Sequence, residues 1–151
     1  MNLDPDSYHG EPGAAAALLR LLGQARVDVV VEAVENIAAA DAARIRHMVN
    51  GLRAAAIPFA LDDVGASNGL VSFELLAFAD YLKFDRTLVQ APREPRRLAV
   101  AEALVDMTAR TGARAVMVGI ETRDDLEIAR DLGIGLVQGD LFRDRFIRVK
   151  P

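Results

Sequence analysis

The 151-residue chain contains no cysteine and no tryptophan, and aromatic residues make up only 5% of it. Without cysteine it can form no disulfide, thiolate zinc site or catalytic thiol, and this composition is typical of a reducing compartment, so we expect a cytoplasmic location. No uninterrupted apolar run approaches the roughly 20 residues of a membrane span. The first residues also lack the basic and apolar stretches of a secretory signal. We therefore expect no contact with a membrane.

Positive charge is also scarce, since 18 Lys and Arg stand against 22 Asp and Glu, for a formal net charge of -4. Such a chain has no general attraction for a nucleic-acid polymer or an anionic lipid. Hydrophobic residues, in contrast, make up 52% of the sequence, and a chain of this length can bury about 70% of its unfolded surface in one core. Because no Gly/Ser-rich linker or charge block divides it, we predict a single domain over residues 1–151.

Short apolar runs alternate along the chain with Ala-, Leu- and Arg-rich segments of helical period, the pattern of a repeated strand and crossover helix. We predict about five parallel strands joined by right-handed crossovers, hence an α/β fold. The predicted strands are 28–34, 58–64, 81–85, 115–120 and 135–138, and the predicted helices are 14–25, 38–56, 70–78, 94–111 and 122–132. We interpret residues 90–97 as a surface loop leading into a helix, with basic residues that face solvent.

Every predicted strand ends in at least one polar side chain. These residues are Glu32, Glu35, Asp62, Asp63, Lys83, Asp85, Glu121 and Gln138. Because parallel strands deliver their carboxyl ends to one rim, we expect a shared site there, although any single acid could simply cap the next helix. Carboxylates that converge repel one another unless a cation or a proton lies between them, which favours Mg²⁺ or Mn²⁺. Lys83 could hold a phosphate or an attacking water in such a site.

Four blocks of sequence resemble motifs of the EAL domain, the bacterial phosphodiesterase module for cyclic di-GMP. Residues 29–36 (VVVEAVEN) are similar to its E-x-T-E strand end, 59–67 (FALDDVGAS) to A-L-D-D-F-G-T-G, 81–89 (YLKFDRTLV) to Y-L-K-I-D-R-x-F-V, and 118–142 to its E-G-V-E-T…Q-G-Y-L-F ending. The order and spacing of the blocks also match. The opening MNLDPDS resembles the family's N-L-S-P, so the resemblance covers essentially the whole chain.

The resemblance implies a partial TIM-like (β/α) barrel. EAL domains have roughly 240 to 250 residues, so the chain would begin about 90 residues into the domain, without the first strands and the name-giving glutamate. A literal Glu102-Ala103-Leu104 falls within a predicted helix and is a coincidence of letters.

The resemblance also implies roles for individual residues. Metal ligands would be Asn2, Glu32 and Asp62, with Asp63 near a second metal; Lys83 would assist the attacking water, Glu35 and Glu121 would support the catalytic groups, and Gln138 and Arg86 would contribute to substrate binding.

Two departures from the family pattern affect the expected activity. Val118 stands where the family has the first glutamate of E-G-V-E, and Val64-Gly65-Ala66-Ser67-Asn68 replaces Phe-Gly-Thr-Gly-Tyr. Losing one carboxylate from a metal centre can remove several kcal/mol of stabilisation, and each 1.36 kcal/mol is tenfold in rate. With two glutamates missing, we predict an incomplete Mg²⁺ or Mn²⁺ site. The function expected is that of a degenerate, catalytically inactive module that binds or regulates in cyclic di-GMP signalling.

Two alternatives stay open at this point. The chain could be a phosphodiesterase that is active only when a partner or a missing N-terminal segment completes its site. It could also be a receiver-like phosphoacceptor, but the strand order argues against this because Lys83 follows Asp62 and Asp63 by a single strand. An incomplete barrel would leave sheet edges and apolar surface uncovered, so we expect a homodimer or a protein partner to cover them.

Overall fold

A computed structural model describes residues 14–24, 29–34, 42–66, 73–90 and 94–145. Its elements, in chain order, are α2 (Ala14–Gly23), β1 (Val31–Val34), α3 (Ala42–Ala54), β2 (Phe59–Val64), α4 (Phe73–Phe78), β3 (Tyr81–Phe84), α5 (Arg86–Gln90), α6 (Pro95–Thr111), β4 (Arg114–Met117), α7 (Arg123–Asp131), β5 (Leu136–Val137) and the 3-10 helix η2 (Asp140–Arg145). The strands form one sheet in the order β1-β2-β3-β4-β5, and every neighbouring pair is parallel. The prediction of five parallel strands alternating with helices is confirmed.

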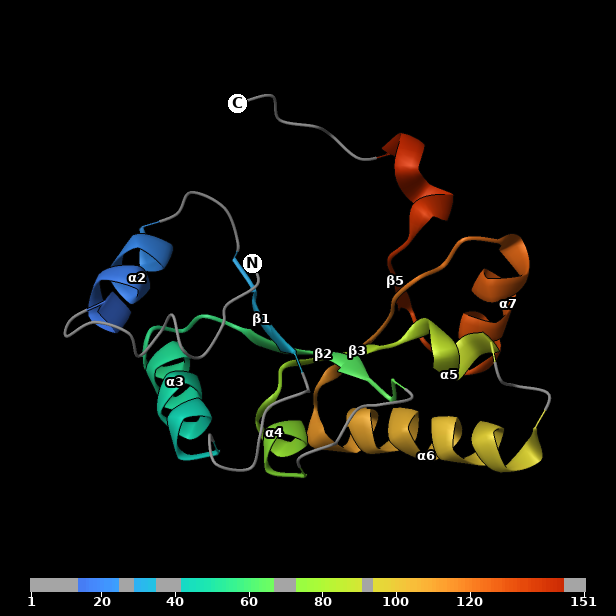
Figure 1. Cartoon of the computed structure of the whole chain (residues 1–151), viewed down its shortest axis with the longest axis horizontal. Coiled ribbons are helices and arrows are strands. Elements are labelled where there is room, and N and C mark those ends of the chain that lie inside the picture. Colours follow the sequence, from blue (N-terminus) through green and yellow to red (C-terminus); the bar gives the residue numbers. More distant parts are fainter. Residues whose placement is uncertain (1–13, 25–28, 35–41, 67–72, 91–93, 146–151) are drawn as a thin grey trace.

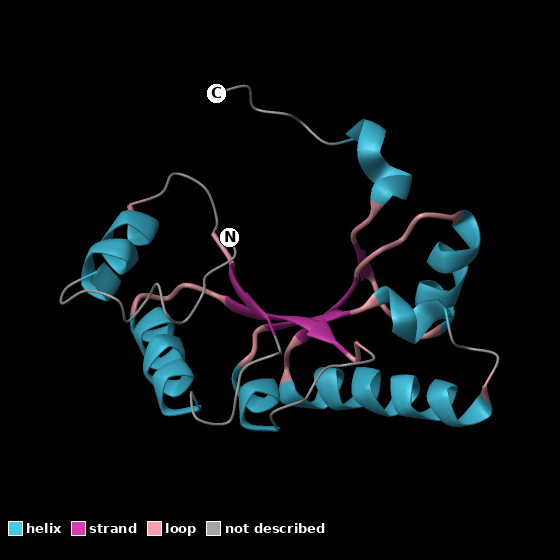
Figure 2. Ribbon diagram, in the orientation of Figure 1, coloured by secondary structure: helices cyan, strands magenta, loops and turns pink. Residues whose placement is uncertain are grey.

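The sheet is curved, and α3, α4 and α6 lie along its convex side (Figures 1 and 2). Such curvature is the result of strand twist when successive parallel strands are joined by crossover helices. The arrangement corresponds to part of a β/α barrel, with the concave side of the sheet corresponding to the barrel interior.

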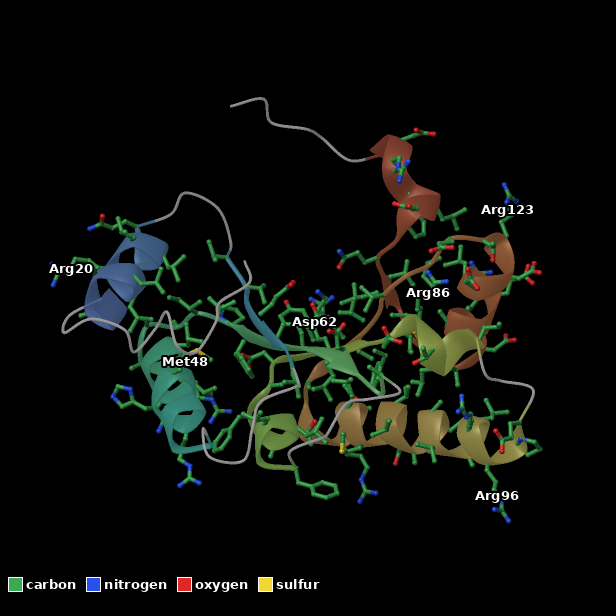
Figure 3. The ribbon with its side chains drawn as sticks, in the orientation of Figure 1. Arg20, Met48, Asp62, Arg86, Arg96 and Arg123 are labelled. Carbon is green, nitrogen blue, oxygen red and sulfur yellow. The ribbon has the colours of Figure 1, made fainter. Side chains whose placement is uncertain are left out.

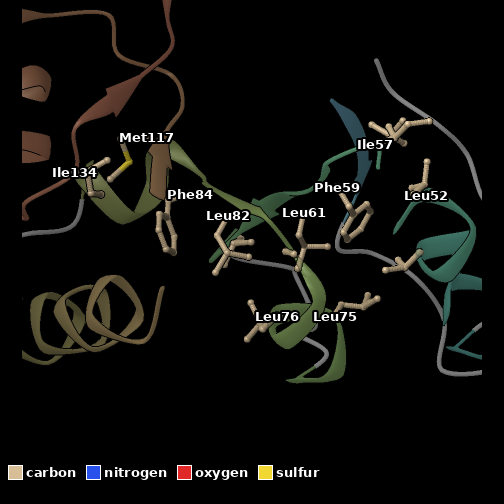
Figure 4. Packing of buried hydrophobic residues seen from close by; sticks show 14 of the residues in the cluster. Leu52, Ile57, Phe59, Leu61, Leu75, Leu76, Leu82, Phe84, Met117 and Ile134 are labelled. Atoms are coloured by element: carbon tan, nitrogen blue, oxygen red, sulfur yellow. The ribbon is translucent and has the colours of Figure 1, made fainter. Parts of the chain in front are cut away.

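The core lies between the convex side of the sheet and the helices. Because side chains alternate across a strand, Leu82 and Phe84 both face this core, as do Phe59 and Leu61 of β2, and all four are completely buried. Leucines of α4 approach them from the helical side (Figure 4). Each such side chain contributes about 1.5–3 kcal/mol of burial free energy. The alternate residues of the same strands are thereby directed to the concave side.

Two helix ends have well-defined caps. Thr122 begins α7 with a capping box, since its hydroxyl accepts a hydrogen bond from Asp125 N and the Asp125 carboxylate accepts one from Thr122 N. Gly112 ends α6 with φ at 80°, in the left-handed region that glycine adopts without strain. The letters Glu102-Ala103-Leu104 lie within α6, as expected.

Two differences from the prediction lie directly after β3 and at the end of β4. Residues 86–90 form the short helix α5, because Asp85 ends β3 and accepts a hydrogen bond from Thr87 N at 2.8 Å, which starts a helix at once. Strand β4 ends at Met117 instead of continuing to residue 120, because Gly119 turns the backbone with φ at 74°. In the described part of the chain, no helix is long and apolar enough to cross a membrane.

Candidate functional site

The carboxyl end of β2 carries two adjacent aspartates on an irregular turn of backbone. The pairing of β2 with β3 shifts register between Leu61 and Val64, the mark of a β-bulge. Asp63 has φ at 59°, a left-handed conformation in which Asp is tolerated better than most residues. The Asp62 carboxylate accepts a hydrogen bond from Asp63 N at 3.0 Å. The bulge therefore presents two consecutive carboxylates at the rim in different directions.

Lys83 connects the ends of the first three strands. Its Nζ donates hydrogen bonds to Asp62 Oδ2 at 2.7 Å and to Glu32 Oε2 at 2.9 Å, and the residue is only 6% exposed. Burial opposes the charged ammonium, but the hydrogen bonds and attraction from Asp62 and Glu32 outweigh it and raise the pKa of Lys83. The ammonium is therefore charged at neutral pH and forms ion pairs with two carboxylates of the rim.

Asp63 experiences a different environment from its neighbour. Partial burial, together with the negative charges of Asp62 and Asp85, raises the pKa of the Asp63 carboxyl, and Lys83 offsets only part of this effect. Asp85 is held in place by the Thr87 N–H, at the start of α5. Negative charge is therefore concentrated around Asp63, between Asp62 and Asp85.

A second ion pair crosses from the start of α5 to the loop after β4. Arg86 Nη1 donates to Glu121 Oε1 at 2.6 Å, and both side chains are about half exposed. The Arg86 stem passes over Gly119, where an added Cβ would lie 2.7 Å from Arg86 Cβ. Glu121 N in turn donates to the Asp125 carboxylate at 3.1 Å. Gly119 and the Asp125 carboxylate that caps α7 thus help to position the Arg86 guanidinium at the rim.

These residues line a single cleft of about 290 Å³. The lining residues are Glu32, Asp62, Asp63, Lys83, Asp85, Arg86, Val118, Gly119 and Gln138. Asp62 and Arg86 lie on the concave side of the sheet, whereas Arg96 points away from it (Figure 3). The expected convergence of strand-end residues is therefore present. The chemical roles predicted for the individual residues stay predictions.

The predicted site residues divide into three groups. Six of them line the cleft: Glu32, Asp62, Asp63, Lys83, Arg86 and Gln138. Glu121 is joined to the cleft through its ion pair with Arg86, while Asn2 and Glu35 lie outside the described residues. Sequence reasoning did not assign Gly119 to the site. The only sequence signal was a glycine directly after Val118, and its closeness to the Arg86 stem is visible only in the structure.

The carboxylates of the cleft have the oxygen donors that Mg²⁺ and Mn²⁺ prefer, but their arrangement does not fit a divalent centre. Within residues 14–24, 29–34, 42–66, 73–90 and 94–145, no group of three or more His, Cys, Asp or Glu side chains is placed to hold a metal ion. Glu32 and Asp62 are both turned toward Lys83, and Val118 adds an apolar group to the wall. No chemical step through a metal follows from this geometry.

The sequence model of the EAL domain family matches residues 1–144. The chain belongs to the EAL domain family. It is 27% identical over 127 residues to the cyclic di-GMP phosphodiesterase PdeL of Escherichia coli (strain K12), which covers 83% of this chain and 35% of PdeL. It is also 28% identical over 96 residues to the cyclic di-GMP phosphodiesterase NbdA of Pseudomonas aeruginosa, covering 63% of this chain and 12% of NbdA.

Solved EAL structures have the same fold as this domain. Klebsiella pneumoniae BlrP1, in its complex with calcium and cyclic di-GMP, superposes with a TM-score of 0.80 at 29% identity, covering 93% of this chain and 36% of BlrP1. BlrP1 in its manganese and cyclic di-GMP complex at pH 9.0 gives a TM-score of 0.78 at 30% identity. This EAL domain thus spans about a third of the length of PdeL and of BlrP1.

Proposed function

We propose that this EAL domain binds cyclic di-GMP and regulates a partner in bacterial cyclic di-GMP signalling without hydrolysing the nucleotide. The observation that carries the proposal is the composition of the cleft. Arg86, whose guanidinium is about half exposed, offers positive charge for phosphates, while Val118 presents an isopropyl group where the family motif has a glutamate. The similarity to PdeL and to the nucleotide complexes of BlrP1 supports cyclic di-GMP as the ligand.

Arg86 and Gln138 are the residues we assign to the nucleotide. The Arg86 guanidinium is about half exposed, so a phosphate oxygen could replace the Glu121 carboxylate without a buried charge being left unpaired. Gln138 is exposed at the end of β5 and carries both a donor and an acceptor. Charged hydrogen bonds of this kind contribute about 1.5–3 kcal/mol each, enough to orient a ligand in an open cleft.

Hydrolysis by two metal ions needs ligands that neutralise about four positive charges and generate hydroxide at neutral pH. In this cleft Glu32 and Asp62 are already paired with Lys83, and Val118 contributes no oxygen. Lys83, Glu121 and Glu35, the predicted catalytic residues, would then be retained without the metal ligands that hydrolysis needs. We therefore expect no significant phosphodiesterase activity from the chain.

Isothermal titration calorimetry with cyclic di-GMP, run in a chelator and again with Mn²⁺, tests the proposal, and chromatography of the same samples detects any hydrolysis. We expect saturable binding that Arg86→Met weakens by about tenfold, the loss of one charged hydrogen bond. Arg110→Met is the matched control, because Arg110 forms an exposed ion pair with Asp106 on α6, away from the cleft. Absence of binding, or equal loss in both variants, would refute the proposal.

The alternative function is a phosphodiesterase whose cleft is completed by a partner or by further chain of its own. Turnover near 10 per second, the ordinary rate for an enzyme, would favour it. Val118→Glu separates the two functions most sharply, because it restores a carboxylate to the wall of the cleft. Activity that appears in Val118→Glu with Mg²⁺ or Mn²⁺ would support the completed-site alternative for this family member.

We also propose that the domain associates with itself or with another protein. Two observations support this. In the described sheet, β1 and β5 are the edge strands, and an edge strand presents unpaired backbone groups. On the convex side, an apolar groove of about 580 Å³ lies between α4, α5 and α6, and Phe73 and Val100 beside it are 84% and 55% exposed. A homodimer is the form we favour.

Light scattering at micromolar concentration measures this association directly. We expect a dimer in the native chain, and a monomer when Phe73→Asp places a charge beside the groove. Leu21→Asp is the matched control, because Leu21 is an exposed apolar residue of α2 outside the groove. A monodisperse monomer of the native chain would contradict the homodimer. The cytoplasmic location stays a prediction.

A further inference from the structure

We propose that the Glu121 carboxylate is an internal competitor of anionic ligands for the Arg86 guanidinium. The native chain then binds a phosphate ligand more weakly than Arg86 would allow without its partner, and removal of the Glu121 charge makes that binding tighter. The inference concerns the regulation of affinity in the cleft and rests on the proposed function for cyclic di-GMP as the ligand. Its test also uses a simpler anion, so that the two proposals can fail separately.

The ion pair of Arg86 and Glu121 joins the cleft to the loop that follows β4. Arg86 is one of the residues that line the cleft, at the start of α5, and Glu121 directly precedes the cap of α7. Arg86 Nη1 donates to Glu121 Oε1 at 2.6 Å. Charge-assisted hydrogen bonds of this kind are about twice as strong as neutral ones. A guanidinium of the cleft wall is therefore already bound to a carboxylate before any ligand enters.

Both partners of this ion pair are held from behind. The Glu121 N–H donates to the Asp125 carboxylate at 3.1 Å, and the same carboxylate accepts from Thr122 N at 2.8 Å in the capping box of α7. The Arg86 stem packs against Gly119. Because these contacts restrict both residues, the ion pair loses less conformational entropy on forming than a pair of unrestrained side chains would. Glu121 therefore competes effectively for the guanidinium.

A ligand can still displace Glu121, because the ion pair is open to water. The side chains of Arg86 and Glu121 are 45% and 51% exposed, so water can solvate the released carboxylate. Displacement nevertheless breaks a charged hydrogen bond, and the released carboxylate stays close to the incoming phosphate and repels it. Both effects lower the affinity for the ligand, and neither operates when residue 121 is uncharged.

Other roles for Glu121 predict the opposite result. If its carboxylate accepted a hydrogen bond from the ligand, loss of the charge would weaken binding. If it served only to orient Arg86 toward a phosphate, loss of the charge would again weaken binding, because the guanidinium would be less ordered before the ligand arrives. Tighter binding is expected only if Glu121 competes with the ligand.

Calorimetric titration with cyclic di-GMP in chelator compares the native chain with Glu121→Gln, which keeps the size of the side chain and its capacity for hydrogen bonds. Asp106→Asn is the matched control, because it removes one negative charge from the exposed ion pair with Arg110 on α6. We expect Glu121→Gln to bind about fivefold more tightly than the native chain, and Asp106→Asn to bind within about twofold of it. In the Arg86→Met background, most of the gain from Glu121→Gln should disappear.

Unchanged or weaker binding by Glu121→Gln would overturn the inference. A full gain in the Arg86→Met background would overturn it as well, because Glu121 would then act through general repulsion and not through Arg86. Pyrophosphate, followed by the NMR signal of the Arg86 Nε–H group, repeats the comparison without the nucleotide.

The pyrophosphate titration keeps the two proposals apart. If the native chain binds no cyclic di-GMP, the proposed function fails, while the comparison with pyrophosphate still decides the inference. A response of Arg86 at lower pyrophosphate concentration in Glu121→Gln than in the native chain supports competition. An equal response in both chains, or no response in either, refutes it.

Discussion

Two basic residues at the rim of this EAL domain, Lys83 and Arg86, lie only three positions apart, yet their ion pairs occupy very different environments. Lys83 is buried and joins the ends of three strands, whereas the side chains of Arg86 and Glu121 are 45% and 51% exposed. Their contact distances are similar, from 2.6 to 2.9 Å. Burial, and not distance, therefore decides what each contact does. The lysine contact belongs to the fold, while the arginine contact can exchange its partner for a ligand.

We expect the largest loss of stability when the buried ion pairs of Lys83 are broken. Lys83→Met should lower the free energy of unfolding by about 2–3 kcal/mol, because it leaves Glu32 and Asp62 facing each other without a cation. This is below the usual cost for a fully buried pair, since both carboxylates keep some contact with water. Urea unfolding without added metal measures the change. An unchanged midpoint would mean that the lysine contact contributes no more than a surface pair.

The second largest loss of stability is expected when Gly119, which supports the exposed ion pair of Arg86 with Glu121, is replaced. Gly119→Ala should cost about 1–2 kcal/mol, because φ is 74° at this position and the new methyl group would press on the Arg86 stem. Gly135→Ala serves as the control, because nothing lies within 4 Å of a Cβ built at Gly135. Thermal unfolding of both variants measures the difference. Equal stability of the two would show that Gly119 does not position Arg86.

A smaller change, a gain of stability, is expected when Asp63 beside the Lys83 ion pairs is replaced. Folding raises the pKa of Asp63, so ionised Asp63 destabilises the folded state at pH values above that raised pKa. Asp63→Asn should therefore raise the Tm near neutral pH. The gain should disappear as the pH falls below about 4, the ordinary pKa of Asp, because the carboxyl is then protonated in both states. Asparagine also tolerates the left-handed backbone at this position.

Asp62→Asn is the matched variant for this comparison. Asp62 accepts the hydrogen bond from Lys83 at 2.7 Å, so losing its charge should lower the Tm at neutral pH. The two neighbouring aspartates should thus respond in opposite directions to the same substitution. Destabilisation by Asp63→Asn at neutral pH would contradict the account of its environment.

The smallest effect on stability is expected for Arg86→Met. Exposed ion pairs contribute about 0–1 kcal/mol, so this variant should unfold within about 0.5 kcal/mol of the native chain. Denaturant unfolding measures the change, alongside the loss of nucleotide affinity expected for the same variant. A large loss of stability would show that Arg86 is part of the fold, and the contrast with Lys83 would no longer hold.

Much of the fold could be predicted because local periodicity and topology agree. Short apolar runs between segments of helical period indicated the five strands, and their parallel order brought Asp62 and Lys83 to one rim. The helix α5 was missed because residues 86–90 are few and include Thr87 and Val89, which favour strands. The end of β4 was misplaced because residues 118–120 are apolar, and a glycine with positive φ outweighed that pattern.

The contacts within the site could not be read from the sequence in the same way. Lys83 lies 51 residues from Glu32, and periodicity does not say which of several nearby charges will pair. The sequence therefore predicted a lysine for phosphate or water, whereas the fold turns its ammonium toward two carboxylates. Asn2 and Glu35 lie outside the described residues, so their assignments, like the single domain over residues 1–151, stay predictions.

The central claim is that this EAL domain binds cyclic di-GMP and leaves it intact. Calorimetric titration of the native chain with cyclic di-GMP in chelator and in Mn²⁺, followed by chromatography of the nucleotide, tests it most directly. We predict saturable binding under both conditions and recovery of unchanged nucleotide. Absence of binding, or steady conversion to linear product in Mn²⁺, would contradict it.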